Sequence, residues 1–193
     1  MGTRGLFGFR KNGKDKAMYN HYDSYPDWLG KEFLKFILLN KTKLSGLYDR
    51  MIDVNGTKPT KEQQKYCSEM GWYNGSVSTG REDDWYCLLH GLQSLDQWQK
   101  VTDTEGDVFF ENQISFIKDS LYCEYAYIYD IDTNNLELYV GFQKEPDETN
   151  RYGTDCTPGY SDDYYPCKLV YTKSIDENTV ITDVVKDMNT AAN

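Results

Sequence analysis

Histidine is scarce in this sequence, and two kinds of pattern are missing from it. Two of the 193 residues are histidine, and the five cysteines form no C-x-x-C pair. Neither a zinc site nor a disulfide framework is therefore implied, and reduced thiols are expected. No run approaches the roughly 18 apolar residues of a membrane-spanning helix, and the N-terminal MGTRG lacks the apolar core of a signal peptide. We expect a cytoplasmic protein without a membrane partner, a metal or a cofactor.

Basic residues are fewer than acidic residues. The sequence has 21 Lys and Arg residues against 31 Asp and Glu residues, which gives a net charge of -10. A field of this sign repels a phosphate backbone, so a nucleic acid is not expected as a partner. The basic residues that do cluster surround Asp15 and are expected in a solvated hairpin turn. These residues are Arg10, Lys11, Lys14 and Lys16.

Aromatic residues, in contrast, are abundant. The chain has 17 Tyr, 8 Phe and 4 Trp, and side chains of this kind bury large areas and favour a folded state. A length of 193 residues falls within the usual range for one domain. No linker is long enough to divide the chain, so a single domain over residues 1–193 is predicted.

Strands are predicted near both ends of the sequence. Asn12 and Gly13 tolerate positive φ and stand between two runs with aromatics, which predicts a β-hairpin. Alternating apolar residues around a polar DTNN segment predict a second hairpin. The predicted strands span residues 3–10, 16–22, 121–129, 136–142 and 167–173.

Helices are predicted where apolar residues recur with a period near 3.6. Thr60 and Gln63 form a capping box at the start of one helix, and Gly71 ends it. The predicted helices span residues 29–40, 44–51, 60–70, 108–118 and 180–188; residues 73–84 are a predicted loop, and residues 85–90 are helix or strand. The fold class is therefore α+β, with an antiparallel sheet built from the N-terminal hairpin and the C-terminal strands and packed with helices.

The segment YNHYDSYP at residues 19–26 is the strongest candidate for a functional site. Its polar side chains lie where a strand ends and Pro26 begins a helix, whose N-terminus favours an anionic or carbonyl ligand. The alternative is that Asp23 or Ser24 caps the helix and the tyrosines pack. The candidate ligand-binding residues are Arg4, Asn20, His21, Asp23, Ser24 and Tyr25.

Two further patterns invite a chemical interpretation. Cys87 stands three residues before His90, a spacing that would place a nucleophile and a base on one helix face, but no third orienting group accompanies them. Asp130, Asp132 and Asn134 imitate the start of a calcium loop, yet the glycine and the glutamate that such a loop requires are missing. A hairpin turn is the expected structure there.

Residues 1–30 resemble the opening of a family of small uncharacterised proteins carried by bacteriophages and bacteria. The resemblance rests on MGTRG, on YNHYDSYP and on Leu29-Gly30, with later matches at CEYAY and GFQ. It implies an origin, and the cytoplasm of a host cell as the location. On this basis the expected function is non-enzymatic binding of a small molecule, such as a nucleotide-like counter-defence ligand, or of a host protein contacted through exposed tyrosines.

The first 23 residues are also similar to the start of N-terminal-nucleophile amidohydrolases of the bile-salt and penicillin acylase kind. Thr3, Gly5, Gly13, Asn20 and Asp23 fall at similar spacings. The resemblance implies an N-terminal-nucleophile fold in which Thr3 attacks, its freed α-amine is the base, Asn20 supports the oxyanion and Asp23 orients the amine. This alternative requires removal of the two residues that precede Thr3.

Overall fold

The structure, a computed structural model, describes residues 2–73, 83–93, 95–156 and 163–193. The chain divides into two compact units. Unit 1 comprises Met1–Ser45 and Gln113–Asn193, and unit 2 comprises Gly46–Asn112. The single domain stays a prediction, and most of the loop expected at residues 73–84 lies outside the described residues.

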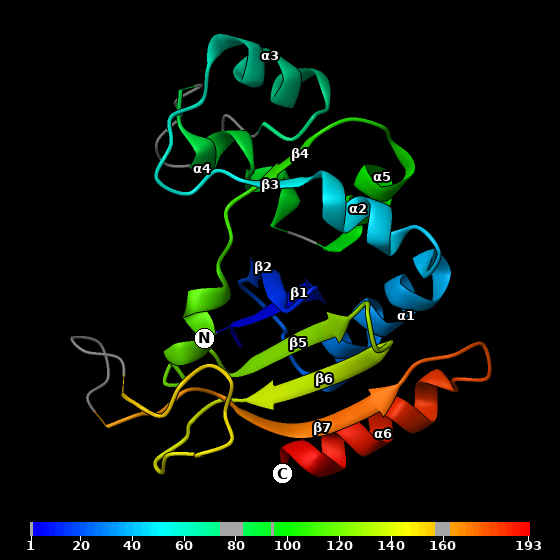
Figure 1. Ribbon diagram of the computed structural model, residues 1–193, viewed down its shortest axis with the longest axis vertical. Coiled ribbons are helices and arrows are strands. Elements are labelled where there is room, and N and C mark those ends of the chain that lie inside the picture. Colours follow the sequence, from blue (N-terminus) through cyan, green and yellow to red (C-terminus); the bar gives the residue numbers. More distant parts are fainter. Residues whose placement is uncertain (1, 74–82, 94, 157–162) are drawn as a thin grey trace. The chain divides into compact units, whose positions relative to one another are not determined.

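Unit 1 is built on a five-stranded sheet with the order β2-β1-β5-β6-β7 (Figure 1). Neighbouring strands are antiparallel except β1 and β5, which are parallel. The predicted α+β class, both hairpins and the last strand are confirmed; the parallel pair joins the two hairpins. The strands are β1 (Gly5–Lys11), β2 (Lys14–Asn20), β5 (Tyr125–Asp130), β6 (Asn135–Val140) and β7 (Lys168–Ser174).

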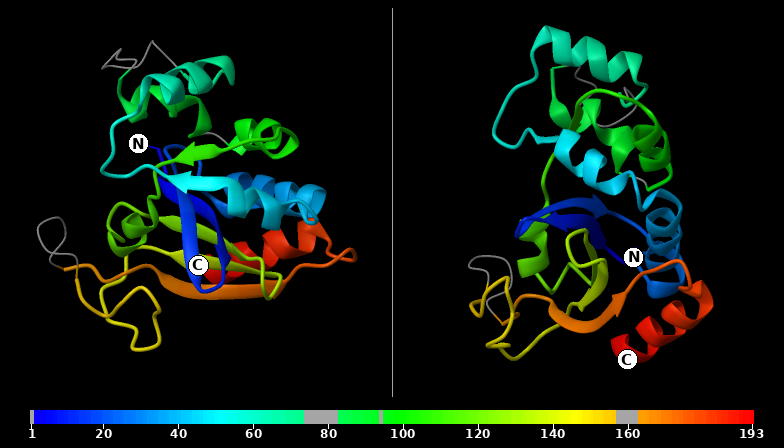
Figure 2. Two further views of the ribbon diagram at one scale, coloured as in Figure 1. Left: turned by 45° about the horizontal axis from the view of Figure 1, so that its top comes forward. Right: turned by 45° about the vertical axis from the view of Figure 1, so that its right-hand side comes forward.

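Helices cover one face of this sheet. A turn of π-helix, η1 (Pro26–Gly30), leads into α1 (Lys31–Asn40), and α6 (Ile181–Ala192) follows β7. The ring of Phe33 on α1 lies 5.7 Å from that of Phe7 and 5.6 Å from that of Phe9. Val184, Val185 and Met188 form the buried side of α6, and both views in Figure 2 show α1 and α6 side by side. The two predicted helices are therefore confirmed, and their apolar sides form the main core of the unit.

The opposite face of the sheet carries a second apolar cluster. Leu6, Ala17, Ala126 and Ile128 pack there with Tyr152, which belongs to the chain between β6 and β7. At the turn of the first hairpin, Asn12 and Gly13 both have positive φ, as predicted. The calcium-like segment is likewise a turn, in which Asp130 Oδ1 accepts hydrogen bonds from the backbone N–H groups of residues 132 and 133.

The helix predicted over residues 108–118 is wrong. The structure instead has a strand, β4 (Val108–Phe110), and a short 3-10 helix, η3 (Ile114–Lys118). Three buried residues with strand propensity pair with a neighbouring strand at the start of this segment. The backbone N–H of Gln113 then donates to the carbonyl of Ala17 at 2.8 Å. This N–H is therefore not used in the hydrogen-bond pattern of a helix.

Unit 2 combines a parallel pair, β3 (Met51–Asp53) and β4, with short helices. The predicted capping box is confirmed: Thr60 Oγ1 accepts from the backbone N–H of Gln63 at 3.2 Å, and Gln63 Oε1 accepts from that of Thr60 at 2.8 Å. Strand β3 and helix α5 were not predicted. The helices are α2 (Leu44–Arg50), which begins in unit 1, α3 (Lys61–Glu69), α4 (Trp85–Leu88), η2 (His90–Leu92) and α5 (Leu95–Asp103).

None of the helices found in the described part of the chain is both long enough and apolar enough to cross a membrane.

Candidate functional site

The candidate segment at residues 19–26 forms a tight junction between β2 and η1. Pro26 occupies the first turn of η1, and Tyr25 stands at its N-cap with an extended backbone and without a side-chain cap hydrogen bond. Asp23 has a φ of 53°, a left-handed conformation that few residues other than glycine adopt. The carbonyl of Asp23 accepts from the backbone N–H of Leu29 at 3.3 Å. The chain therefore reverses sharply at Asp23 and enters the helical turn directly.

Two of the predicted binding residues, Asn20 and Ser24, lie together and hold this reversal in place. Asn20 Nδ2 donates to Ser24 Oγ at 2.8 Å and also to the backbone carbonyl of Tyr22. Ser24 is completely buried, and its carbonyl accepts from the Tyr127 hydroxyl at 2.9 Å. These groups therefore satisfy each other across the junction.

The other predicted residues are spread around this pair. Thr3 is 4% exposed, and its carbonyl accepts from the backbone N–H of Ser24 at 3.2 Å. His21 is exposed, and its Nδ1 lies 2.7 Å from the Tyr19 hydroxyl. Asp23 is exposed as well, so the polar side chains do not converge on one point.

Two glycines allow the close packing beneath the junction. A Cβ on Gly5 would lie 2.7 Å from the Cβ of Ser24, and one on Gly30 would lie 2.7 Å from the ring of Tyr127. Real Cβ atoms do not approach other atoms so closely, so neither position accepts a larger residue without displacement. Burial raises the pKa of Tyr127 well above its usual value, with Tyr125 and Asp27 adding to it. The Tyr127 hydroxyl therefore remains a protonated donor to Ser24.

Aromatic side chains are exposed above this buried pair. We call them the aromatic edge, defined as Tyr22, Tyr25, Tyr122 and Phe142, which are 64%, 45%, 42% and 53% exposed. They lie on adjoining chain segments at one end of the sheet. The Arg4 guanidinium lies 5.4 Å from the centre of the Tyr122 ring, and Tyr25 packs on Tyr125 with 5.8 Å between ring centres.

Backbone hydrogen bonds tie these segments into one surface. The N–H of Ser24 donates to Thr3, as described, and the N–H of Glu124 donates to the Arg4 carbonyl at 3.0 Å. The N–H of Gly141 donates in turn to the Glu124 carbonyl at 2.9 Å. The aromatic edge therefore rests on a continuous backbone ladder. Sequence reasoning identified Arg4 and Tyr25 but missed Tyr122 and Phe142, whose proximity depends on the parallel pairing of β1 with β5.

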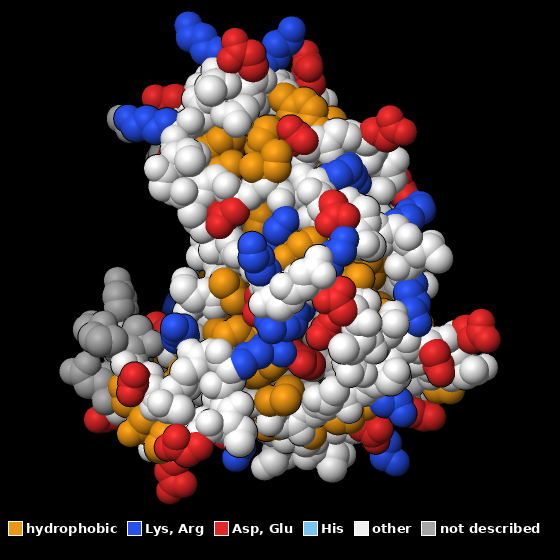
Figure 3. Space-filling view, viewed as in Figure 1, with side chains coloured by type: hydrophobic (Ala, Val, Ile, Leu, Met, Phe, Trp, Pro, Cys, Tyr) orange, Lys and Arg blue, Asp and Glu red, His pale blue; other side chains and the backbone are white. Residues whose placement is uncertain are grey.

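A charged network lies toward the other end of the same sheet. Arg151 Nη1 and Nη2 donate to Glu137 Oε1 and Oε2 at 2.9 and 2.6 Å, and Nη2 lies 3.5 Å from Asp15 Oδ1. The hydroxyl of Tyr139 donates to Glu137 Oε2 at 3.0 Å. Arg10 completes the network with an ion pair of 2.7 Å to Asp15. Acidic and basic side chains are also interspersed over this sheet in the space-filling view (Figure 3).

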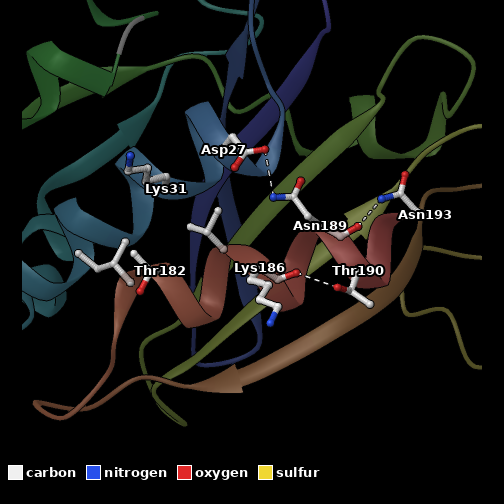
Figure 4. A pocket seen from close by; sticks show the side chains of 9 residues that line it. Asp27, Lys31, Thr182, Lys186, Asn189, Thr190 and Asn193 are labelled. Carbon is white, nitrogen blue, oxygen red and sulfur yellow. Dashed lines mark hydrogen bonds between the residues drawn. The ribbon is translucent and has the colours of Figure 1, made fainter.

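A groove of about 450 Å³ runs between η1 and α6 (Figure 4). Ile181 and Val185 contribute its apolar part, and Asp27 accepts from Asn189 Nδ2 across it at 3.0 Å. Lys31 and Lys186 stand at its margins in the figure. The groove therefore lies just beyond the predicted segment, which ends at Pro26.

The other residues considered for catalysis or metal binding are not arranged as a site. Cys87 is completely buried in α4, whereas His90 belongs to η2 with its ring 5.3 Å from that of Tyr86. The two residues therefore do not share one helix face. Within the described ranges, no three His, Cys, Asp or Glu side chains are grouped as metal ligands.

No protein-family model, no curated protein and no solved structure matches the chain. The function must therefore be inferred from the residues themselves.

Proposed function

We propose that this chain is a non-enzymatic binding protein that contacts a basic protein partner through the aromatic edge. The observation that carries the proposal is the exposure of four large aromatic side chains on one backbone ladder, with Arg4 among them. Tyrosine, phenylalanine and arginine are enriched at protein interfaces, where they bury large areas and dominate the binding energy.

The hydrogen bonds that the polar residues already form favour a protein over a small molecule as the binding partner. Asn20 and Ser24, the pair expected to orient a small ligand, bond to each other. A ligand would have to replace that contact before gaining its own. An interface partner needs no such exchange, because the aromatic edge is already exposed and its base is already rigid.

The charge of the chain favours a basic partner. A net charge of -10 attracts a positively charged protein over a long range and repels an acidic one. Asp23 is exposed and lies between Tyr22 and Tyr25 in the sequence, so lysine or arginine of the partner would meet both a carboxylate and ring faces. The resemblance of residues 19–26 to phage and bacterial proteins supports a host protein as this partner.

The geometry gives less support to an amidohydrolase built on Thr3. Thr3 is 4% exposed, and the Asn20 amide donates to Tyr22 and Ser24. Both residues are thus engaged in the junction rather than facing a substrate. No observation in the described part of the chain favours this alternative.

Site-specific photo-crosslinking in a lysate tests the proposal. A photoreactive phenylalanine replaces Tyr22 or Tyr122 in turn, and the same residue at Leu39, which is 74% exposed on α1, is the control. We expect one protein of net positive charge to crosslink at positions 22 and 122 only. The purified partner should then bind the unmodified chain with an affinity that falls as salt rises, and a Tyr22→Ser, Tyr122→Ser double variant should lose at least about tenfold. Equal crosslinking at position 39, or an acidic partner, contradicts the proposal.

A further inference from the structure

Two of the five cysteines are neighbours in the core of unit 1, although 44 positions separate them in the sequence. Cys123 lies two residues before β5, and Cys167 immediately precedes β7. The thiol of Cys167 donates to the carbonyl oxygen of Cys123 at 3.2 Å. Both side chains are completely buried in the same apolar cluster. Their closeness is therefore a property of the folded sheet.

Each member of the pair is held at its backbone. The N–H of Cys167 donates to the Ile117 carbonyl and that of Cys123 to the Asp119 carbonyl, at 2.9 and 2.8 Å. Asn150 Nδ2 donates to the carbonyl of Cys167 at 2.9 Å. The two thiols cannot drift apart without breaking these contacts.

We propose that Cys123 and Cys167 form a specific intramolecular disulfide when the chain folds in the presence of a small-molecule disulfide. One thiolate attacks the reagent, forms a mixed disulfide and releases one thiol. The second thiolate then attacks the protein sulfur of that mixed disulfide and releases the second thiol. The protein loses two hydrogen atoms, and the reagent is reduced.

The other cysteines provide the contrast. Cys67 and Cys87 are buried in unit 2, and Cys156 is partly exposed in the chain that leads to β7. Burial is the largest cause that raises the pKa of Cys123, and the hydrogen bond with Cys167 adds to it. A raised pKa makes the folded thiol slow to react, so the bond should form during folding rather than by attack on the finished core.

The experiment refolds the full chain from denaturant in a mixture of reduced and oxidised glutathione, and then blocks free thiols with an alkylating reagent in denaturant, so that buried thiols also react. Mass spectrometry should find the peptides that carry Cys123 and Cys167 joined, with Cys67 and Cys87 alkylated. A Cys156→Ser variant should give the same pairing, and a Cys123→Ser variant should not. The oxidised chain should melt about 5–15 °C above the reduced chain, because the bond closes a long loop in the unfolded state.

The proposal is overturned if the chain refolds to its native circular dichroism spectrum and all five thiols are then found free, that is, alkylated. A different dominant pair, such as Cys156 with Cys167, overturns it equally. The result from the unmodified chain decides the question even where a serine variant fails to fold. The outcome does not depend on whether the aromatic edge binds a partner.

Discussion

The two polar regions of unit 1 differ in how they are assembled along the chain. The junction takes Asn20 and Ser24 from one short segment, whereas the charged network joins residues from β1, β2, β6 and the chain after β6. The first region is neutral and holds a local chain reversal. The second fixes a distant segment on the sheet through charges. Polar residues that are contiguous in sequence thus indicate a turn as readily as a site. The ion pairs that join Arg151 to Asp15 and Glu137 left no local pattern in the sequence, because they connect distant segments.

If this contrast is correct, breaking the charged network should have the largest effect on stability. Glu137→Gln leaves Arg151 without its bidentate partner, and the side chain of Arg151 is only 27% exposed. We expect the free energy of unfolding to fall by about 2–4 kcal/mol, measured by urea denaturation. In a Glu137→Gln, Arg151→Gln double variant the loss should be smaller than the sum of the single losses. A loss below about 1 kcal/mol for Glu137→Gln would show that the network is not a structural anchor.

The junction should give a smaller loss. Asn20→Ala removes hydrogen bonds to Ser24 and Tyr22 and leaves the buried Ser24 hydroxyl without this donor. We expect the free energy of unfolding to fall by about 1–2 kcal/mol. Ligand and catalytic residues are often retained at a cost to stability. An Asn20→Ala variant more stable than the parent would therefore favour a binding or catalytic role and contradict the structural one.

Alkaline pH should weaken the charged network through Tyr152, whose hydroxyl accepts a hydrogen bond from Arg151 Nη2 at 3.0 Å. Burial, followed by the charge of Asp15, raises the pKa of Tyr152 above the ordinary value of 10.0. Because the folded state holds this proton more tightly than the unfolded state, the contribution to stability is complete below about pH 10 and is lost as the pH rises further. Tyr152→Phe should therefore lose less stability than the parent between about pH 10 and pH 12. Urea denaturation at several pH values measures the variant against the parent, with Tyr22→Phe, a change in the aromatic edge, as the matched control.

The aromatic edge should contribute least to stability. Tyr22→Ser and Tyr122→Ser remove exposed rings, so we expect each to change the free energy of unfolding by no more than about 0.5 kcal/mol. Thermal denaturation of both variants checks this expectation. A loss above about 1.5 kcal/mol would mean that the rings support the fold, and would remove the reason for assigning them to a partner.

Local patterns in the sequence predicted most elements of unit 1. Asn12-Gly13 specified the first hairpin, and the spacing of apolar residues specified α1 and α6, because these signals depend on neighbours along the chain. The same reasoning failed for residues 108–118, where strand pairing and a bond from Gln113 to Ala17 override a helical period. It also could not place Tyr122 and Phe142 beside Arg4, since that proximity arises only from the pairing of β1 with β5.

The parallel pairing of β1 with β5 has a consequence for synthesis on the ribosome. The first hairpin leaves the ribosome with Phe7 and Phe9 in strands whose remaining neighbour, β5, has not been made. At typical translation rates the hairpin waits roughly 5–20 s for that strand. During this interval β1 presents an unpaired edge, which is the surface that associates most readily with other chains. The aromatic core of unit 1 is thus completed late, and α1, whose Phe33 packs on Phe7 and Phe9, is the element made early enough to cover them until then.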